Sequence, residues 1–437
     1  MLKEELLDDA AARWPAAVKG HGTAGAETIN SMLPLRLLTP QAVRSTAPAN
    51  VMGAILRGVA DRSFVSRPQL VAATSLARST IDGCIARLID ANVLEEYEGV
   101  RQSRYGRPGT ALSVSPLAGT VCAAEIDTRF IRLAISDLNQ DVLGVAEVKH
   151  QIEAGPQSAV DVVMDAYESL LKRIHQSIGR LLCVAVSVPG PVDVHRGVAV
   201  RPPIMPGWDE FPLSRELSNH FGCPIVVDND VNLMAIAESR VLDSKSLPML
   251  VIKVDTGIGS GLVLPNGELL RGAAGAAGDI GHVSVPEGDG TICTCGNVNC
   301  LEAVASLEAV ARKLTAPGGA PVTQEDVLAR VGAGDGAATR AVRDAAATIG
   351  KIVAALVHFY NPARIVLASH LIEVTDDLLA GIRSEVYKRA LPLATRNLAI
   401  THGLLGDTAA ITGGLVLAIE HTFAPDRIND LLTKQAR

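Results

Sequence analysis

Apolar and polar positions follow two different periods along the chain, and the change between them divides it into parts. Near the N-terminus, apolar residues recur every three or four positions in three segments, which predicts amphipathic helices over about 51–61, 66–75 and 77–94. Ser66 is a suitable N-cap for the second. Two short extended runs follow, joined by a turn-rich tip. Three helices and a β-ribbon within 47–116 form the plan of a winged helix-turn-helix.

From Thr120 the pattern changes to alternating strands and helices. The first group predicts strands at 121–126, 130–136 and 141–148, a helix over 156–178 and a strand at 181–188. A second group predicts strands at 248–255, 260–265 and 267–272, helices over about 301–315 and 335–358, and a strand at 364–369. Each group opens with a three-strand meander. The pattern therefore predicts an α/β domain of two lobes, about 117–245 and 246–437, with a cleft between them.

Composition agrees with a globular protein of more than one domain. The 437 residues are 48% hydrophobic and 20% charged. The acidic N-terminus does not resemble a signal peptide and no long apolar run follows, so we expect a cytoplasmic protein without membrane association. Residues 1–46 are expected to be a partly helical leader. The net charge of −7 is uneven, because residues 1–115 carry 13 basic and 11 acidic side chains.

Three cysteines and one histidine have the spacing of a metal loop. Cys293, Cys295 and Cys300 lie within eight residues around Gly296, and His282 precedes them. Thiolate and imidazole are the ligands of tetrahedral zinc, and a structural site uses four protein ligands. Ordinary buried thiols in a reducing compartment are the alternative interpretation. The clustering favours a structural Zn²⁺ held by a loop over 279–302.

Polar residues of the third predicted helix are candidates for DNA contact. A recognition helix presents such residues to base edges and phosphates: here they are Arg78, Ser79, Thr80, Asp82 and Arg87. The ribbon tip adds Arg104 and Arg107, in a composition suited to a wing that contacts phosphates or a minor groove. A solvated helix face and an exposed loop are the alternative.

Polar residues of the predicted lobes point to a ligand site. Asn229 and Asp230 follow the strand-like run PIVVD, at the kind of strand end where α/β folds gather ligands. The glycine-rich segment 255–261 could present backbone N–H groups to an anion. Asp279 and Glu302 flank the predicted zinc loop, so zinc would order them as partners for a polyhydroxyl ligand.

These motifs resemble those of the ROK family of repressors and sugar kinases, over roughly 50–420. The resemblance rests on Gly281-His282, on the run from Cys293 to Glu302, on Asn229-Asp230-Val231-Asn232, and on Val188 to Asp193. Ser66-Arg67 and Gly106-Arg107-Pro108 resemble marks of its DNA-binding module, which makes Arg67 a further DNA candidate. The family implies an actin-like (ribonuclease H-like), two-lobed sugar kinase fold, zinc on one His and three Cys, and dimers or tetramers. It also implies a sugar site formed by Gly190, Asn229, Asp230, Asp279, His282 and Glu302.

Two departures separate the chain from the kinases of that family. Their phosphate-binding Asp-x-Gly-Gly-Thr corresponds to Glu125-Ile126-Asp127-Thr128-Arg129, where side chains replace both glycines. Their adenosine-binding glycine pair corresponds to Ser369-His370. We therefore expect no kinase activity and no catalytic residues. Asp279 also stands where the family has glutamate, which puts the direct sugar contact in question.

The sequence thus predicts a transcriptional repressor that binds double-stranded operator DNA as a homodimer or homotetramer and responds to a sugar or sugar derivative. One alternative is an ATP-dependent sugar kinase with an added domain. Another is a DNA-binding regulator whose kinase-like lobes serve only dimerisation or protein contacts.

Overall fold

The computed structural model describes residues 29–31, 33–38, 47–74, 76–98, 110–174 and 178–435. Its N-terminal module contains the three helices and the ribbon that the pattern predicts. They are α3 (Pro48–Ala60), α4 (Arg67–Thr74), α5 (Arg78–Asp90), β1 (Leu94–Glu98) and β2 (Thr110–Val114). The two strands pair antiparallel. Ile81, Ile85 and Leu88 are fully buried, because the helical spacing brings them onto one face of α5.

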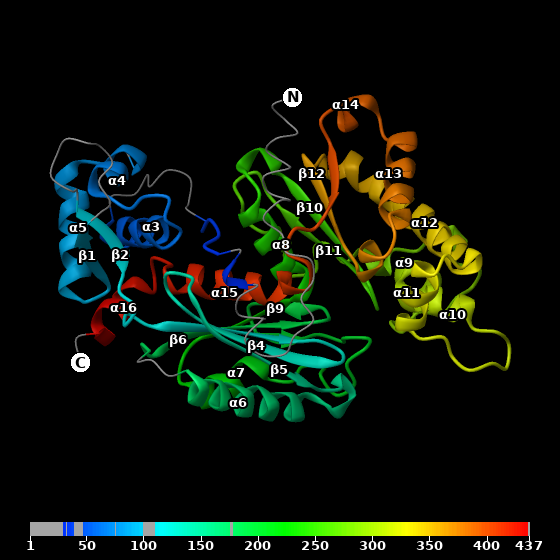
Figure 1. The fold of residues 1–437 in the computed structure, drawn as a ribbon, viewed down its shortest axis with the longest axis horizontal. Coiled ribbons are helices and arrows are strands. Elements are labelled where there is room, and N and C mark those ends of the chain that lie inside the picture. Colours follow the sequence, from blue (N-terminus) through cyan, green and yellow to red (C-terminus); the bar gives the residue numbers. More distant parts are fainter. Residues whose placement is uncertain are drawn as a thin grey trace.

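The first lobe is a five-stranded sheet in the order β5-β4-β3-β6-β9. Its strands are β3 (Thr120–Ile126), β4 (Phe130–Asp137), β5 (Val142–Lys149), β6 (Leu181–Val188) and β9 (Ile225–Asn229). The first three form the expected antiparallel meander, and β6 and β9 continue it in parallel. Helices α6 (Pro156–Arg173) and α7 (Leu213–Phe221) cover one face (Figure 1). A small ribbon of β7 (Val192–Asp193) and β8 (Val198–Ala199) completes this lobe.

The second lobe repeats this plan with one strand fewer. Its sheet has the order β11-β10-β12-β13, in which only β10 and β11 are antiparallel. The strands are β10 (Met249–Val254), β11 (Ile258–Val263), β12 (Arg364–Ala368) and β13 (Ala399–His402). Helices pack around them: α9 (Leu301–Ala305), α10 (Leu307–Leu314), α11 (Gln324–Gly332), α12 (Gly336–Tyr360), α13 (Asp377–Arg389) and α14 (Pro392–Thr395).

Two predicted elements of the second lobe differ in the structure. The strand expected at 267–272 is reduced to a single bridge between Val263 and Leu269. The chain then leaves the sheet, and Arg271 turns toward the first lobe to bind Asp228 at 2.7 Å. The helix expected over 301–315 is broken at Ser306, whose side chain caps α10 by accepting the N–H of Ala309 at 3.1 Å.

The C-terminal helices pack outside the second lobe. Helix α15 (Ala409–Thr422) lies against β3 and β6 of the first sheet and against α8 (Asp230–Val241), and α16 (Ile428–Gln435) contacts α3 (Figure 1). Helices α15 and α8 approach closely at Gly413, where a Cβ would lie only 1.9 Å from the carbonyl oxygen of Leu233. The segment 246–437, expected to form one lobe, therefore also closes the first lobe and supports the N-terminal module.

Glu420 of α15 joins three parts of the chain at one point. Its carboxylate accepts hydrogen bonds from the Nε of Arg240, at the end of α8, and from the backbone N–H of Leu38. Its carbonyl oxygen accepts from Arg57 of α3. Leu38 belongs to the expected leader, whose Ile29, Leu35 and Leu37 are buried in a core shared with the module. The described part of the leader is thus integral to the fold.

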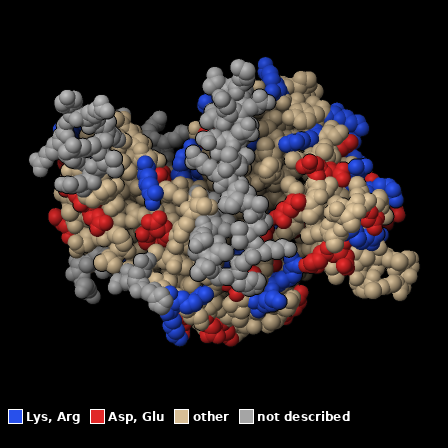
Figure 2. Space-filling model, in the orientation of Figure 1, with Lys and Arg blue, Asp and Glu red and all other residues tan. Residues whose placement is uncertain are grey.

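No helix in the described ranges is long and apolar enough to cross a membrane. Figure 2 shows acidic and basic side chains interspersed over the visible face of the second lobe. Such a mixed distribution does not indicate a partner of one particular charge on that face.

Candidate functional site

A cavity between the lobes gathers all six residues expected to bind a sugar. Its lining includes Gly190, Asn229, Asp230, Asp279, His282 and Glu302. The first three come from the first lobe and the others from the segment around the cysteine loop. The structure therefore brings these residues together, although they are separated by up to a quarter of the chain.

The first-lobe side of the cavity is built where β9 passes into α8. Asn229 is the N-cap of α8: its side chain accepts the N–H of Val231 and donates to the carbonyl of Gly190, each at 3.0 Å. Asp228 is buried behind it and accepts hydrogen bonds from Asn232 and Arg271, each at 2.7 Å. This network fixes the orientation of the amide and carboxylate groups at the cavity wall.

Asp230 has a partner that the sequence analysis missed. The ammonium of Lys253, on β10, lies 2.7 Å from its carboxylate. Burial opposes the charge of Lys253, but Asp230, Asp255 and Asp127 outweigh this effect and raise its pKa above the ordinary value. A lysine within the apolar run of 249–254 was the available signal, since a buried lysine needs an acidic partner.

The glycine-rich segment holds a carboxylate of the chain itself. Glu302 accepts the backbone N–H of Ile258 at 3.1 Å. A Cβ on Gly257 would lie 2.5 Å from the same carboxylate oxygen, so a glycine is needed for this approach. Burial raises the pKa of Glu302, while this hydrogen bond acts to lower it.

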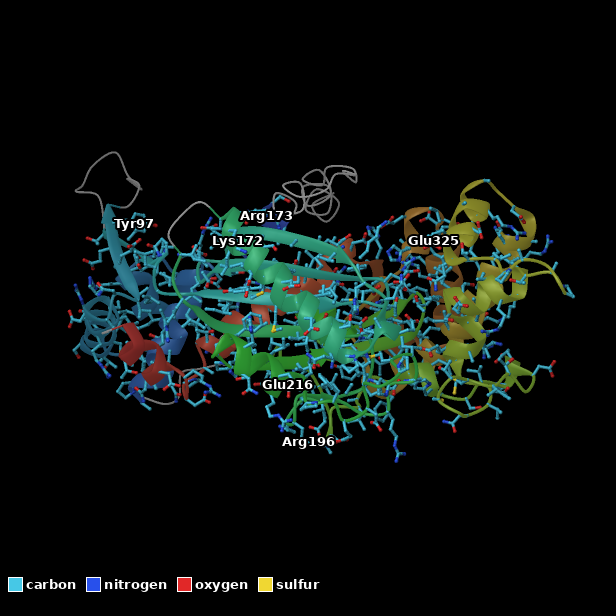
Figure 3. The ribbon with its side chains drawn as sticks, turned by 90° about the horizontal axis from the view of Figure 1, so that it is seen from below. Tyr97, Lys172, Arg173, Arg196, Glu216 and Glu325 are labelled. Atoms are coloured by element: carbon cyan, nitrogen blue, oxygen red, sulfur yellow. The ribbon has the colours of Figure 1, made fainter. Side chains whose placement is uncertain are left out.

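Residues 125–129, which were expected from the sequence to differ from a kinase phosphate loop, are held by ion pairs and a hydrogen bond. The side chain of Glu125 is 12% exposed and lies 3.1 Å from Arg132. Desolvation raises its pKa to about 7, although Arg132 and Lys253 act to lower it. Asp127 accepts the backbone N–H of Arg129 at 3.1 Å. The guanidinium of Arg129 pairs with Glu325 of α11, which Figure 3 labels where the second lobe meets the first. That pair connects the two lobes.

His370, the second place where a departure from the kinases was expected from the sequence, also makes ionic contacts. Its Nδ1 lies 3.0 Å from Asp255 and its Nε2 lies 3.3 Å from Asp407. Hydrogen bonds to these two carboxylates raise its pKa to about 10. The imidazole is therefore a cation held between two acidic side chains at neutral pH.

The predicted zinc ligands form a compact cluster. The ligand atoms of His282, Cys293, Cys295 and Cys300 all lie within 4.8 Å of one another. Cys293 Sγ is 3.7 Å from His282 Nδ1, and the sulfur atoms of Cys295 and Cys300 are 3.6 Å apart. Ligand atoms around tetrahedral zinc are separated by about 3.5–3.8 Å, given zinc–sulfur distances of about 2.3 Å. The cluster thus fits a four-coordinate metal.

The backbone around the cluster explains why these side chains converge. Single bridges join Ile292 to Val298 and Ser284 to Cys300, which folds the loop into a narrow hairpin. Gly296 turns the chain with a φ of 89°, a conformation that side chains rarely adopt. His282 ends a short 3₁₀ turn that begins at Ile280, directly after Asp279. Metal binding would therefore hold two cavity residues, Asp279 and His282, in place.

The DNA candidates fall into two groups in the structure. Arg78, Ser79 and Arg87 are exposed on α5; the side chain of Arg78 is 82% exposed, and its Nε lies 3.5 Å from Asp82 one turn along the helix. Thr80 is half-buried on the same helix. Arg67 and Asp82 pair with each other at 3.3 Å, and Arg67 also pairs with Glu96 at 2.6 Å, so both brace the module internally. Arg104 and Arg107 lie outside the described residues.

The chain is similar to proteins of one family, which includes repressors and sugar kinases. The profile described as "ROK family" matches residues 122–421. The "DNA-binding transcriptional repressor Mlc" of Escherichia coli is 25% identical over 375 residues, covering 84% of this chain and 92% of the repressor. A glucokinase of Halalkalibacterium halodurans is 30% identical over 300 residues, covering 65% of this chain and 90% of the enzyme.

A solved structure has the same arrangement over most of the chain. The crystal structure of a ROK family transcriptional regulator, a homologue of the E. coli Mlc protein, superposes with a TM-score of 0.74 at 22% identity. The match covers 89% of this chain and all of the other. The likeness therefore extends beyond the two lobes.

Proposed function

The chain belongs to the ROK family, and we propose that it is a DNA-binding transcriptional repressor controlled by a sugar bound between its lobes. The observation that carries the proposal is the N-terminal module of α3, α4, α5, β1 and β2, which lies outside the two kinase-like lobes. The repressor relative aligns over 375 residues, against 300 for the glucokinase.

The proposed DNA-binding unit is a winged helix-turn-helix within 47–116. Helix α5 would enter the major groove, because it buries one face and exposes Arg78, Ser79 and Arg87 on the other. The ribbon of β1 and β2 would carry the wing, with Arg104 and Arg107 at its tip. Two copies in a homodimer or homotetramer would contact a two-fold operator in the cytoplasm. Arg67, Asp82 and Thr80 would position α5.

Sugar control is proposed to act through the two-lobed domain, 117–437. A sugar among the six cavity residues would alter how the lobes pack. The change would reach the module through α8, α15 and Glu420, since α8 begins at the cavity and ends at the Arg240–Glu420 pair. Coupling between ligand and operator is typically about 1–3 kcal/mol.

His282, Cys293, Cys295 and Cys300 would hold a structural Zn²⁺. Four protein ligands leave no open coordination position, so the ion would supply order and no Lewis-acid chemistry. The ordered segment would then hold the side chains of Asp279 and His282 toward the sugar.

A second candidate function is an ATP-dependent sugar kinase, which the glucokinase relative favours. Three contacts count against it. Lys253 already neutralises Asp230, the residue that resembles the family's catalytic base, at 2.7 Å. Arg129 is paired across the lobes with Glu325. His370, which resembles a glycine position of the adenosine site, is held between Asp255 and Asp407. We expect no transfer of the γ-phosphoryl group of ATP to glucose, xylose or N-acetylglucosamine in a coupled assay.

The test is a fluorescence-anisotropy titration of the zinc-loaded protein with its own upstream DNA and a scrambled duplex at near-physiological salt. We expect preference for its own DNA by about three powers of ten or more. Arg78→Ala should lower the affinity by about 1–3 kcal/mol. Arg215→Ala, which removes an exposed arginine of α7, is the matched control. Equal, salt-sensitive binding to both duplexes would contradict the proposal.

A further inference from the structure

The charges around the cavity point to the chemical class of its ligand. Four acidic residues line it: Asp127, Asp230, Asp279 and Glu302. Among the described residues of the lining there is one lysine, Lys253, and no arginine. The wall is therefore acidic on balance, and a dianionic ligand would be repelled.

The one ammonium of the lining is already paired. Lys253 Nζ lies 2.7 Å from Asp230, and the field of Asp255 and Asp127 adds to that of its partner. A phosphate that approached Lys253 would have to displace a carboxylate held on the rigid start of α8. A charged pair of this kind leaves little attraction for a further anion.

The nearby arginines are committed in the same way. Arg271 gives two hydrogen bonds to the buried Asp228, at 3.0 and 2.7 Å. Arg132 binds Glu147 and Glu125. Arg129 pairs with Glu325. These three guanidinium groups thus each have a carboxylate as a partner.

Two backbone donors of the glycine-rich segment already have acceptors within the chain. The turn at Gly257 is the place where a glycine-rich segment could bind a phosphate. Here the Ile258 N–H donates to Glu302 at 3.1 Å, and the Ser260 N–H donates to the carbonyl of Gly278 at 3.0 Å. The anion bound by this turn is the chain's own carboxylate.

We propose that the effector is an unphosphorylated sugar and that the cavity rejects the phosphate esters of the same sugar. The proposal rests on the proposed sugar control and adds the substrate class. Carboxylates suit a neutral polyhydroxyl ligand, because they accept hydrogen bonds from its hydroxyl groups. The same carboxylates disfavour a phosphate group. Asp127 is the best residue for testing the effect of charge, because it lines the cavity and is not one of the six residues expected to bind the sugar.

The experiment is isothermal titration calorimetry of the full-length, zinc-loaded protein. The probes are glucose, xylose, mannose and N-acetylglucosamine, and the 6-phosphates of glucose, mannose and N-acetylglucosamine. We expect at least one neutral sugar to bind and every 6-phosphate to bind at least tenfold more weakly than its parent sugar. A 6-phosphate that binds as tightly as its parent, or more tightly, would overturn the inference and leave sugar control intact. Failure of every probe to bind would instead remove the sugar control on which the inference rests.

Two variants test whether charge is the cause. Asp127→Asn should lower the ratio of the dissociation constant of a 6-phosphate to that of its neutral parent sugar at least threefold. Asp165→Asn removes an exposed carboxylate of α6 and should leave the ratio of the two dissociation constants unchanged. An unchanged ratio in Asp127→Asn, with a folded protein by circular dichroism, would show that acidic repulsion does not set the specificity.

Discussion

Replacing Glu420 by alanine would remove the contact point of three segments. The side chain is 12% exposed and its partner Arg240 is 6% exposed, so the ion pair is largely buried. The variant would leave the guanidinium of Arg240 without its carboxylate, and the backbone N–H of Leu38 without its acceptor at 2.6 Å. Arg57 would keep its hydrogen bond to the backbone carbonyl of residue 420.

The expected cost follows from leaving a buried charge unpaired. Breaking one side of a buried ion pair typically costs about 3–5 kcal/mol of unfolding free energy. For a cooperative unit of about 200 residues this corresponds to a fall in Tm of roughly 6–20 °C. Thermal unfolding followed by circular dichroism measures the fall. Hydrogen exchange of α3 peptides would report loosening of the module, and we expect faster exchange there than in α13.

Two variants separate the buried charge from a general effect of mutation. Glu216→Ala removes an α7 glutamate that pairs with Arg215 at 3.5 Å and is 35% exposed, so it should cost at most about 1 kcal/mol. Glu420→Gln keeps an acceptor oxygen and should fall between the parent and Glu420→Ala. If Glu420→Ala costs no more than Glu216→Ala, the conclusion that this buried carboxylate stabilises the junction of α8, α15 and the segment around Leu38 is refuted.

Three further outcomes are expected. Gly413→Ala should lower the free energy of unfolding in urea by about 1–3 kcal/mol or more, because its Cβ would lie 1.9 Å from a carbonyl oxygen of α8; Gly83→Ala, whose Cβ would meet nothing within 4 Å, should raise it by up to about 1 kcal/mol, and similar losses in both would contradict the packing. Burial raises the pKa of Glu238 from 4.5 to about 7, so the folded chain retains a proton that the unfolded chain releases; stability should therefore fall as pH rises from about 4.5 to 7 and level off above, and Glu238→Gln should flatten Tm against pH in that window. Cys295→Ser should reduce bound zinc, measured by mass spectrometry of the metal, from one ion per chain to less than half of that, whereas Cys84→Ser should retain it; retained zinc in Cys295→Ser would contradict the four-ligand site.

Local periodicity was enough to predict most of the elements. The helices at 51–61 and 77–94 were expected close to their observed bounds, because the burial of residues such as Ile81 and Ile85 follows directly from their spacing. The prediction of a strand at 267–272 was wrong, because the local pattern does not reveal that Arg271 pairs with Asp228, 43 positions earlier. The placement of α15 was missed for a related reason. The helix is buried on nearly every side, so its sequence indicates a core helix without indicating which sheet it covers.

The candidate site was predictable where a motif carries its own chemistry. The cysteines and histidine cluster, and Asn229 and Asp230 line the same cavity wall, as expected from their spacing within one segment. The pairing of Lys253 with Asp230 depends on how β10 and α8 meet, which no local pattern records. The glycine-rich segment was interpreted as an anion site, and the anion turned out to be Glu302, 44 positions beyond Ile258.

The packing of α3 against the last helices has a consequence for synthesis of the protein. Val51 and Ile55 share one core with Phe423, Ile428 and Leu431, so the first helices of the chain complete their packing against the last. A ribosome that adds about 5–20 residues per second needs roughly 20–70 s between these two segments. During that interval the apolar face of α3 lacks its final cover. We expect nascent chains to engage chaperones at this face, and chains stopped before α15 to be degraded before they can occupy any operator.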